Sequence, residues 1–448
     1  MHLMFENVLK NLMLLWTGGY KGLDTGSEDY QLPPTVWEAI GEASALAGDT
    51  IPSAFGPRPP NVAKDNTSWT ADLRSFWALY LGPVLLTGRF THRRYYEHFV
   101  LLVQLIHRCL QFEISTGEVD EIRTGFIKWV RQYEKIYYQG DPARLSTCPL
   151  TIHALLHIAD SIMAAGPVWT SWAFPMERYC GSLQRSIRSR RFPFASLNRY
   201  VLDKARLTQV KHIYDLGDAL RLAPPDLEGF YGGACILGYQ TCALLTPRRP
   251  DINASALERG LLTKLVGALI TRFGGTIQAT HTALRSAQIE EWGRIRILPD
   301  GDTIRAASAQ SLAGGDSGPT RDASYVRYEA LVDRNARSRN AAIQLVPKTF
   351  YGQLQRILVL HCPPIPSSTH SALTPLIFAV IRTCKITADH PTLDIHYYSR
   401  DSSTDLVDIT TVQCLVGRVR DRNQWAIIDR SGTLSRALYE GHEAGDAI

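Results

Sequence analysis

The sequence has no Cys-x-x-Cys pair, although eight cysteines are scattered over its 448 residues. No secretory leader is recognisable either, so we expect reduced thiols in a cytosolic or nuclear protein. Long apolar runs are missing as well, because stretches such as residues 12–16 are far too short to span a bilayer. The sequence therefore predicts no membrane partner.

The remaining composition is typical of a soluble globular protein. Hydrophobic residues make up 45% of the chain and charged residues 20%, and the length suffices for two or three domains with their own cores. The formal net charge of +5 is mild. Its distribution is more informative than its total, because one segment is strongly basic.

That segment runs from position 178 to position 211. It contains nine cations against one acid, Asp203, which gives roughly +8 by formal counting. The cations are Arg178, Arg185, Arg188, Arg190, Arg191, Arg199, Lys204, Arg206 and Lys211. A segment of this charge predicts a polyanion as partner.

Glu177 precedes the basic segment at a predicted helix start. Pro175 suits the first turn of a helix, because its missing N–H would be unpaired there in any case, and a carboxylate in that turn faces the positive end of the helix dipole. Helical spacing places Glu177 at the edge of an apolar face made of Met176, Tyr179, Cys180, Leu183 and Ile187. Two interpretations stay open: the acid holds a divalent metal against a phosphate backbone, or it faces solvent and complements the dipole.

Four short motifs between positions 155 and 214 resemble one known family. They are Leu-Leu-His-Ile-Ala-Asp-Ser-Ile (155–162), Gly-Pro-Val-Trp (166–169), Phe-Pro-Met-Glu-Arg (174–178) and Ser-Arg-Arg-Phe (189–192). Together they resemble the transposase-associated domain of CACTA (En/Spm) type DNA transposons. The resemblance implies a cut-and-paste transposase of the DDE type with a ribonuclease-H-like core, in which Glu177 would be the third metal-binding acid.

The same resemblance implies partners, cofactors and location. Transposon-end DNA would bind Arg178, Arg185, Arg188, Arg190, Arg191, Arg199, Lys204 and Arg206. Self-association is a further state that the resemblance leaves open. An intact parent enzyme would use Mg²⁺ or Mn²⁺, whereas we expect no cofactor in this chain, and the protein would be nuclear.

The first residues already keep the spacing of a core helix, with apolar side chains at 5, 8, 9, 12, 15 and 16. In the family, an Asp-x-x-His or Cys-x-x-His signature precedes such a helix, and His2 resembles its histidine. We therefore expect the remainder of the signature and the first two catalytic aspartates upstream of Met1. One carboxylate cannot hold a pair of catalytic metals, so we expect this C-terminal portion to be inactive alone.

The fold that we predict is α+β, with a mainly helical N-terminal half and a small β-rich barrel or sandwich after it. Helical spacing predicts helices at about 35–47, 68–86, 91–114, 119–138 and 196–214. The last of these is expected to bury one face, which carries Leu197, Tyr200, Val201, Ala205 and Val210. The expected parts are a helical insertion-type region (1–165), the Glu177-bearing helices of a partial ribonuclease-H-like core (166–221), a linker with a helix and a hairpin (222–318), and the β-rich domain (319–440). Aromatics are dense at positions 69–99 and indicate core packing more than base stacking.

His153 and His157 lie one helical turn apart, with Cys148 before them and Asp160 after them. This spacing can supply metal ligands, although no Glu follows His153 and the zinc-protease signature is therefore missing. The alternative is a structural histidine pair that packs on Asp160.

Three functions from different classes stay open. The first is a transposase portion that binds DNA through the basic segment. The second is a domesticated, transposon-derived interaction protein without catalysis, whose β-rich module binds another protein. The third is a metal hydrolase that uses His153, His157 and Cys148.

Overall fold

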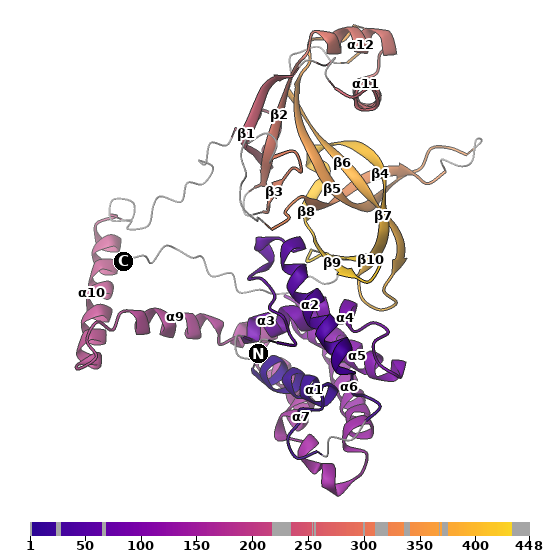
Figure 1. The fold of residues 1–448 in the computed structure, drawn as a ribbon. Coiled ribbons are helices and arrows are strands. Elements are labelled where there is room, and N and C mark those ends of the chain that lie inside the picture. The colour runs from indigo at the N-terminus through magenta and orange to yellow at the C-terminus, as the bar shows by residue number, and fades with distance from the viewer. Residues whose placement is uncertain are drawn as a thin grey trace.

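The computed structural model in Figure 1 describes most of the chain. The described residues are 2–23, 28–64, 69–216, 234–252, 254, 257–298, 301–309, 321–335, 341–366, 368–369 and 375–431. Of Phe174, Pro175 and Arg178 only the backbone is described. The boundary expected at position 222 and the linker residues 310–318 therefore lie outside the described residues.

Residues 2–171 form a bundle of helices, which we call the helical body (Figure 1). Its main elements are η1 (His2–Val8), α1 (Leu9–Trp16), α2 (Pro34–Thr50), α3 (Ala71–Phe76), η3 (Trp77–Leu81), α4 (Gly82–Leu85), α5 (Arg93–Cys109), α6 (Thr116–Tyr133), η4 (Glu134–Tyr138), η5 (Pro142–Thr147), α7 (Leu150–Ala154), η6 (Leu155–His157), α8 (Ile158–Ala165) and η7 (Val168–Ser171). The helices predicted at 35–47, 68–86, 91–114 and 119–138 are confirmed within a few residues.

The start of α6 follows directly from the sequence. The Ser115 hydroxyl accepts a hydrogen bond from the Glu118 N–H, while the Glu118 carboxylate accepts one from the Ser115 N–H at 2.7 Å. This capping box satisfies two N–H groups that would otherwise be unpaired at the helix end. Among the described helices, none combines the length and the apolar character needed to cross a bilayer.

The core of the helical body is aromatic. Trp16, Trp77 and Trp129 are fully buried, and the Trp16 indole donates a 3.0 Å hydrogen bond to the hydroxyl of Tyr137, which is buried with it. Buried indole and phenol groups need such partners, because an unpaired polar group in a core costs free energy. The aromatic residues between 69 and 99 are buried or half-buried, so the prediction that they form core is confirmed.

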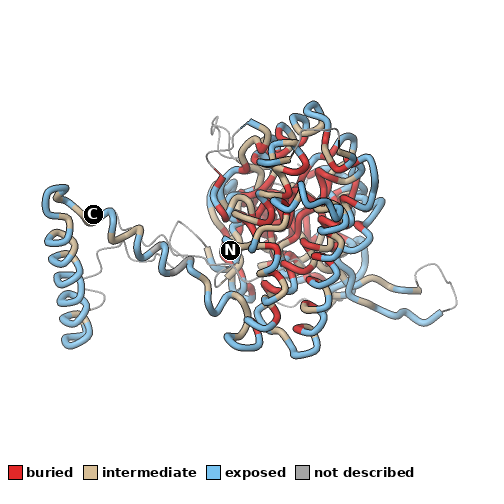
Figure 2. Tube along the Cα trace, turned by 90° about the horizontal axis from the view of Figure 1, so that it is seen from below, coloured by how far each residue is buried: buried red, intermediate tan, exposed pale blue. Residues whose placement is uncertain are grey.

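Two helices project from the helical body. They are α9 (Phe174–Arg185) and α10 (Pro193–Ile213), and we call these helices, together with residues 186–192 that join them, the basic arm. Figure 1 shows the arm extending to one side of the molecule, and Figure 2 shows it in the colours of exposed and intermediate residues. Among the residues of α10, none is buried.

The rest of the described chain forms a curled antiparallel sheet that closes about half of a barrel, with two helices at one end (Figure 1). Its strands are β1 (Cys242–Ile252), β2 (Gln288–Ile297), β3 (Thr303–Arg305), β4 (Tyr325–Asp333), β5 (Leu345–His361), β6 (Pro375–Asp389), β7 (His396–Asp408), β8 (Val412–Leu415), β9 (Gly417–Asp421) and β10 (Gln424–Ile428). The main path of the sheet is β1-β2-β5-β6-β7-β10-β9. The α+β class is therefore confirmed, and the β-rich part is half of a barrel.

Three of these strands lie ahead of position 319, where the sequence placed the start of the β-rich domain. β1, β2 and β3 all belong to the single sheet. The region expected to be a linker, 222–318, therefore supplies one edge of the sheet and the helices α11 (Arg259–Phe273) and α12 (Ile277–Arg285). This differs from the predicted boundary, since β1 is interrupted by prolines and β3 has three residues, whereas the hairpin expected in this region pairs β2 with β3.

The central strands β5 and β6 are covered on both faces. Ile357 and Val359 of β5 join the large core shared with the helical body, whereas Leu358 and Leu360 pack with α11 and α12. Consecutive side chains of a strand point to opposite faces. A strand buried on both sides therefore needs the continuous apolar run that the sequence has at 357–360.

The helical body and the half-barrel share one hydrophobic core and a polar seam. The guanidinium of Arg321 donates to the carbonyl oxygens of Ile51, Pro52 and Gly56 at 2.5–2.9 Å. Nearby, the Thr50 hydroxyl donates to the carbonyl oxygen of Arg418 at 2.5 Å. The α2 end of the helical body is thus fixed to the β9 edge of the sheet.

Candidate functional site

The two residues marked by family resemblance in separate parts of the chain lie in contact. The Nε2 atom of His2, in η1, is 3.0 Å from Oε1 of Glu177, in the first turn of α9. These positions are 175 residues apart in the sequence. The Nδ1 atom of His2 contacts the carboxylate of Glu6, one turn further along the same helix. His2 therefore bridges the helical body and the start of the basic arm.

The two carboxylates make His2 a cation over a wider pH range. Glu6 first, and then Glu177, raises the pKa of His2 above its ordinary value, because both carboxylates bond to the imidazole. The side chains of His2 and Glu177 are 59% and 48% exposed. An ion pair this exposed adds little to stability, so the contact orients side chains more than it holds the fold.

The donor set at His2 does not fit a pair of catalytic Mg²⁺ or Mn²⁺ ions. Such a site needs several oxygen ligands from separate elements, whereas the carboxylates here are Glu6 and Glu177, and both are engaged by one imidazole. Within the described parts of the chain, no group of three or more His, Cys, Asp or Glu side chains is arranged to hold a metal. No catalytic step follows from these residues alone.

The candidate DNA-binding cations lie along the basic arm. Seven of them are exposed: Arg185, Arg188, Arg190, Arg191, Arg199, Lys204 and Arg206. The eighth, Arg178, has a side chain outside the described residues. Asp203 lies 3.8 Å from both Arg199 and Arg206. Among the described residues, no acid lies within ion-pair distance of Arg185, Arg188 or Arg190, so these cations are available to an external anion.

The apolar side chains of the arm differ from expectation. Met176 and Tyr179, predicted for an apolar face of α9, are 64% and 49% exposed. Leu202 and Ile213 of α10 are also exposed. The prediction that α10 buries one face is wrong, because its apolar residues are spread around the whole helix and none of them is buried.

The histidine pair at 153 and 157 is brought together, but its proposed partners are not. The two Nε2 atoms are 3.1 Å apart on the surface. Asp160 instead accepts a 3.0 Å hydrogen bond from Arg123, and Cys148 contacts the hydroxyl of Thr147. A three-residue site from His153, His157 and Cys148 is therefore not formed within the described residues.

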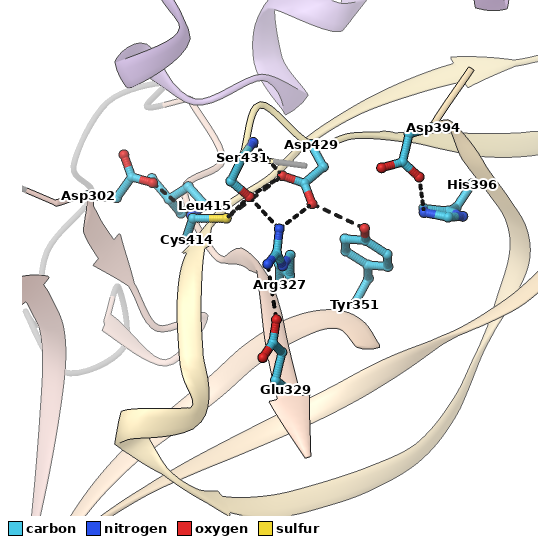
Figure 3. A network of polar contacts seen from close by, with 10 residues as sticks. All are labelled: Asp302, Arg327, Glu329, Tyr351, Asp394, His396, Cys414, Leu415, Asp429 and Ser431. Atoms are coloured by element: carbon cyan, nitrogen blue, oxygen red, sulfur yellow. Dashed lines mark hydrogen bonds and ion pairs between the residues drawn. The ribbon is translucent and has the colours of Figure 1, made fainter. Parts of the chain in front are cut away.

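A second polar centre lies in the half-barrel (Figure 3). The carboxylate of Asp429, only 1% exposed, accepts hydrogen bonds from Tyr351 at 3.1 Å and from both the N–H and hydroxyl of Ser431 at 2.8 and 2.6 Å. Arg327 lies 3.4 Å away, and the thiol of Cys414 completes the cluster at 3.9 Å. Every oxygen of this carboxylate is occupied, so the cluster fastens the end of β10 to its neighbours.

Other acids of the half-barrel are also occupied within the fold. Asp405 accepts hydrogen bonds from Tyr328 and Thr383 at 3.0 and 2.9 Å. Asp408 caps the short helix after β7 and accepts from Tyr239 at 3.0 Å. Asp408 thus has the turn role common for this residue type, whereas Asp405 lies within β7.

A cleft with a volume of about 1150 Å³ lies between α5, α6 and the turn after β6. Its lining includes the cations Arg94, Lys128 and Lys135, together with the acids Glu28 and Asp29. Because both signs of charge meet there, the cleft lacks the one-signed character of the basic arm.

One residue of the candidate site was missed from the sequence. Glu6 stands four positions after His2, which is a spacing that places two side chains on one helix face. That spacing could have identified it. Comparisons with known proteins add no further site residue: the chain matches no family model, no curated protein and no solved structure.

Proposed function

We propose that this chain is the C-terminal part of a CACTA type cut-and-paste DNA transposase, and that it binds DNA through the basic arm. One observation carries the proposal. The resemblance singles out His2 and Glu177 from two separate motifs, and their side chains lie 3.0 Å apart. If the two motifs belonged to unrelated segments, contact between these two side chains would be a coincidence. Two motifs of one site are expected to lie in contact.

Under this proposal Glu177 is the third acid of the parent enzyme, and α9 and α10 are the last helices of its ribonuclease-H-like core. The Mg²⁺ or Mn²⁺ of that enzyme would require acids from outside the described residues, since Glu6 and Glu177 are both bonded to His2. This chain is then a DNA-binding portion without strand cleavage of its own, and it acts in the nucleus.

The charge of the arm supports binding to the phosphate backbone. Arginines that lack an acidic neighbour can replace the counterions of DNA, and this release supplies most of non-specific affinity. Such contacts fix position and carry little sequence information. Transposon ends would therefore be held along the arm by Arg185, Arg188 and Arg190 among others, with sequence read elsewhere.

Fluorescence anisotropy with a labelled DNA duplex tests the binding. The triple variant R185A/R188A/R191A removes three exposed cations of the arm. The plot of log association constant against log salt concentration should then be shallower, with a slope smaller in magnitude by about 2 to 3 between roughly 50 and 200 mM salt. The matched control R285A/K385A/R400A removes three exposed cations from the half-barrel. An unchanged slope in the arm variant would remove the proposal that the arm binds DNA.

The family part of the proposal has its own test. The transcript can be mapped at its 5′ end and the frame upstream of Met1 translated. An acid or cysteine three residues before His2, with two further aspartates ahead of it, would support an intact transposase. A genuine start at Met1 would leave DNA binding as the activity to explain.

A domesticated interaction protein is the second candidate. The exposed apolar residues of the arm favour it, because α10 carries Leu202, Leu207 and Ile213 in contact with solvent and a protein partner would cover them. This candidate predicts no detectable binding to DNA at physiological salt. The anisotropy measurement therefore separates the two functions.

A further inference from the structure

His153 and His157 present their ring nitrogens to each other on the surface of the helical body. The two Nε2 atoms are 3.1 Å apart, and the ring planes meet at 71° with centroids 4.9 Å apart. Both side chains are exposed. The protein thus holds two imidazoles with converging nitrogens next to open solvent.

The backbone below the pair is helical and anchored in the core. His153 belongs to α7 and His157 ends the short turn η6, after which α8 begins. The opposite side of this segment is anchored in the core by Ile152, Leu155 and Ala159, which are 3%, 0% and 1% exposed. Because the inner side packs in the core, the backbone that carries both histidines is positioned before a ligand binds, and this lowers the entropy lost on binding.

The distance between the nitrogens suits a shared metal ion. Nitrogens bound to one zinc at about 2.0–2.1 Å, at the tetrahedral angle, lie about 3.3 Å apart. The observed separation of 3.1 Å is close to this value. In the absence of metal, one Nε2–H donates to the other Nε2. A cation that replaces this hydrogen bond requires that proton to move to Nδ1 and the rings to turn until both Nε2 lone pairs meet the cation.

We propose that His153 and His157 form a two-imidazole chelate for one divalent cation of the zinc, nickel or copper type. Imidazole favours these ions, whereas Mg²⁺ and Ca²⁺ prefer oxygen ligands. Asp160 is engaged by Arg123 and is not a ligand. The remaining coordination positions are open to water or to a donor atom of a binding partner. This site is separate from the basic arm and does not rest on the proposed DNA binding.

Copper provides a direct test, because the electron paramagnetic resonance spectrum of Cu²⁺ reports the nitrogens bound to it. One equivalent of Cu²⁺ is added to the metal-stripped full chain. The wild type should show coupling to two equivalent imidazole nitrogens, and H153A or H157A should lose one of them. Spectra that are the same in all three proteins would overturn the proposal.

Calorimetric titration with zinc chloride gives the stoichiometry. The double variant H153A/H157A should bind one equivalent fewer than the wild type, whereas H212A, which removes another exposed histidine, should bind the same number. Magnesium chloride in excess should not compete. Both positions are exposed, so circular dichroism should show unchanged helix content in every variant. An equal number of equivalents in the double variant would contradict the chelate.

Discussion

The hydroxyl of Tyr96 and the Nε2 atom of His390 lie 2.8 Å apart, and they join α5 of the helical body to the turn after β6. The other nitrogen of His390, Nδ1, accepts hydrogen bonds from the N–H groups of Thr392 and Leu393 at 3.2 and 3.0 Å. The ring proton must therefore sit on Nε2 and point to Tyr96. Every position of this neutral imidazole is used, and a second ring proton would have no acceptor.

Lowering the pH should reduce the free energy of unfolding through the titration of His390. Burial lowers the pKa of His390 to about 4, so between pH 6.5 and 4 the unfolded chain binds a proton that the folded chain does not. Stability is then lost as the pH falls through this window, by about 2 kcal/mol at pH 5. In H390N the amide oxygen can still accept both N–H groups but does not titrate. Urea unfolding at pH 7 and pH 5 should show a smaller loss in H390N.

The control for His390 is Y96F. This variant removes the same 2.8 Å contact but leaves the imidazole free to titrate, so its loss of stability between pH 7 and pH 5 should stay close to that of the wild type. An equal loss in H390N and wild type would show that the acid response lies elsewhere. His98 is the alternative source, because burial lowers its pKa to about 4 as well.

The ion pair of Arg89 with Asp421 should be the strongest single polar contact across the seam between the helical body and the half-barrel. The Asp421 side chain is 2% exposed and lies 2.8 Å from Arg89, which is 20% exposed. R89M leaves the buried Asp421 carboxylate with the half-exposed Arg422 as its counterion, so it should lower the unfolding free energy by roughly 2 to 4 kcal/mol. R422M removes a 52% exposed partner of the same acid and should cost less than about 1 kcal/mol. Equal losses of unfolding free energy in R89M and R422M would contradict a dominant role of Arg89 in pairing with Asp421.

The contact at the candidate site predicts a pKa change. Glu6 and Glu177 both raise the pKa of His2, with Glu6 the larger cause. E177Q should therefore lower the pKa of His2, and E6Q should lower it more, in an NMR titration of the His2 ring proton. The raised pKa contributes stability below the ordinary value of 6.5, and this contribution is lost as the pH rises through the folded pKa. A His2 pKa that is unaffected by E177Q would mean that the two side chains do not meet in solution.

Thiol reactivity should follow burial. Cys180 and Cys235 are exposed, whereas Cys109, Cys242, Cys362 and Cys384 are buried. Burial raises the pKa of Cys109 and of Cys384 to about 12, so little thiolate forms at neutral pH. A coloured disulfide reagent should react rapidly with two thiols in the native chain and with all eight in denaturant. The variant C180S should show one fast-reacting thiol fewer than the wild type. The same number of fast-reacting thiols in both proteins would contradict an exposed Cys180 in α9.

The sequence predicted helices well because their signals are local. The apolar spacing of α5 and the capping box at Ser115 lie within a few residues of the structure that they specify. Strand β1 was missed for an equally local reason. It contains Pro247 and Pro250, which indicate a turn, but β1 pairs only with β2 along most of its length and has irregular register at both prolines. Prolines are tolerated at such an edge.

For the candidate site too, the sequence predicted the local feature but not the contact between distant residues. Helical spacing placed Glu177 in the first turn of its helix, as the structure has it. The contact between His2 and Glu177 spans 175 positions, and no periodic pattern encodes a pairing over that distance. The apolar residues of α10 were expected to be covered by the chain itself. Spacing alone gives the character of a helix face and does not say which surface covers it.

The arm should contribute little to the stability of the rest of the protein, and two leucines provide a matched comparison. Leu102 in α5 is 1% exposed and Leu202 in α10 is 54% exposed. L102A should lower the unfolding free energy by about 2 to 5 kcal/mol, because it leaves a cavity, whereas L202A should change it by less than about 0.5 kcal/mol. Helices that lack packing are only marginally stable in water, so helix content in the arm should rise when a partner binds. A loss in L202A that matches L102A and grows with protein concentration would mean that α10 packs against a second copy of the chain.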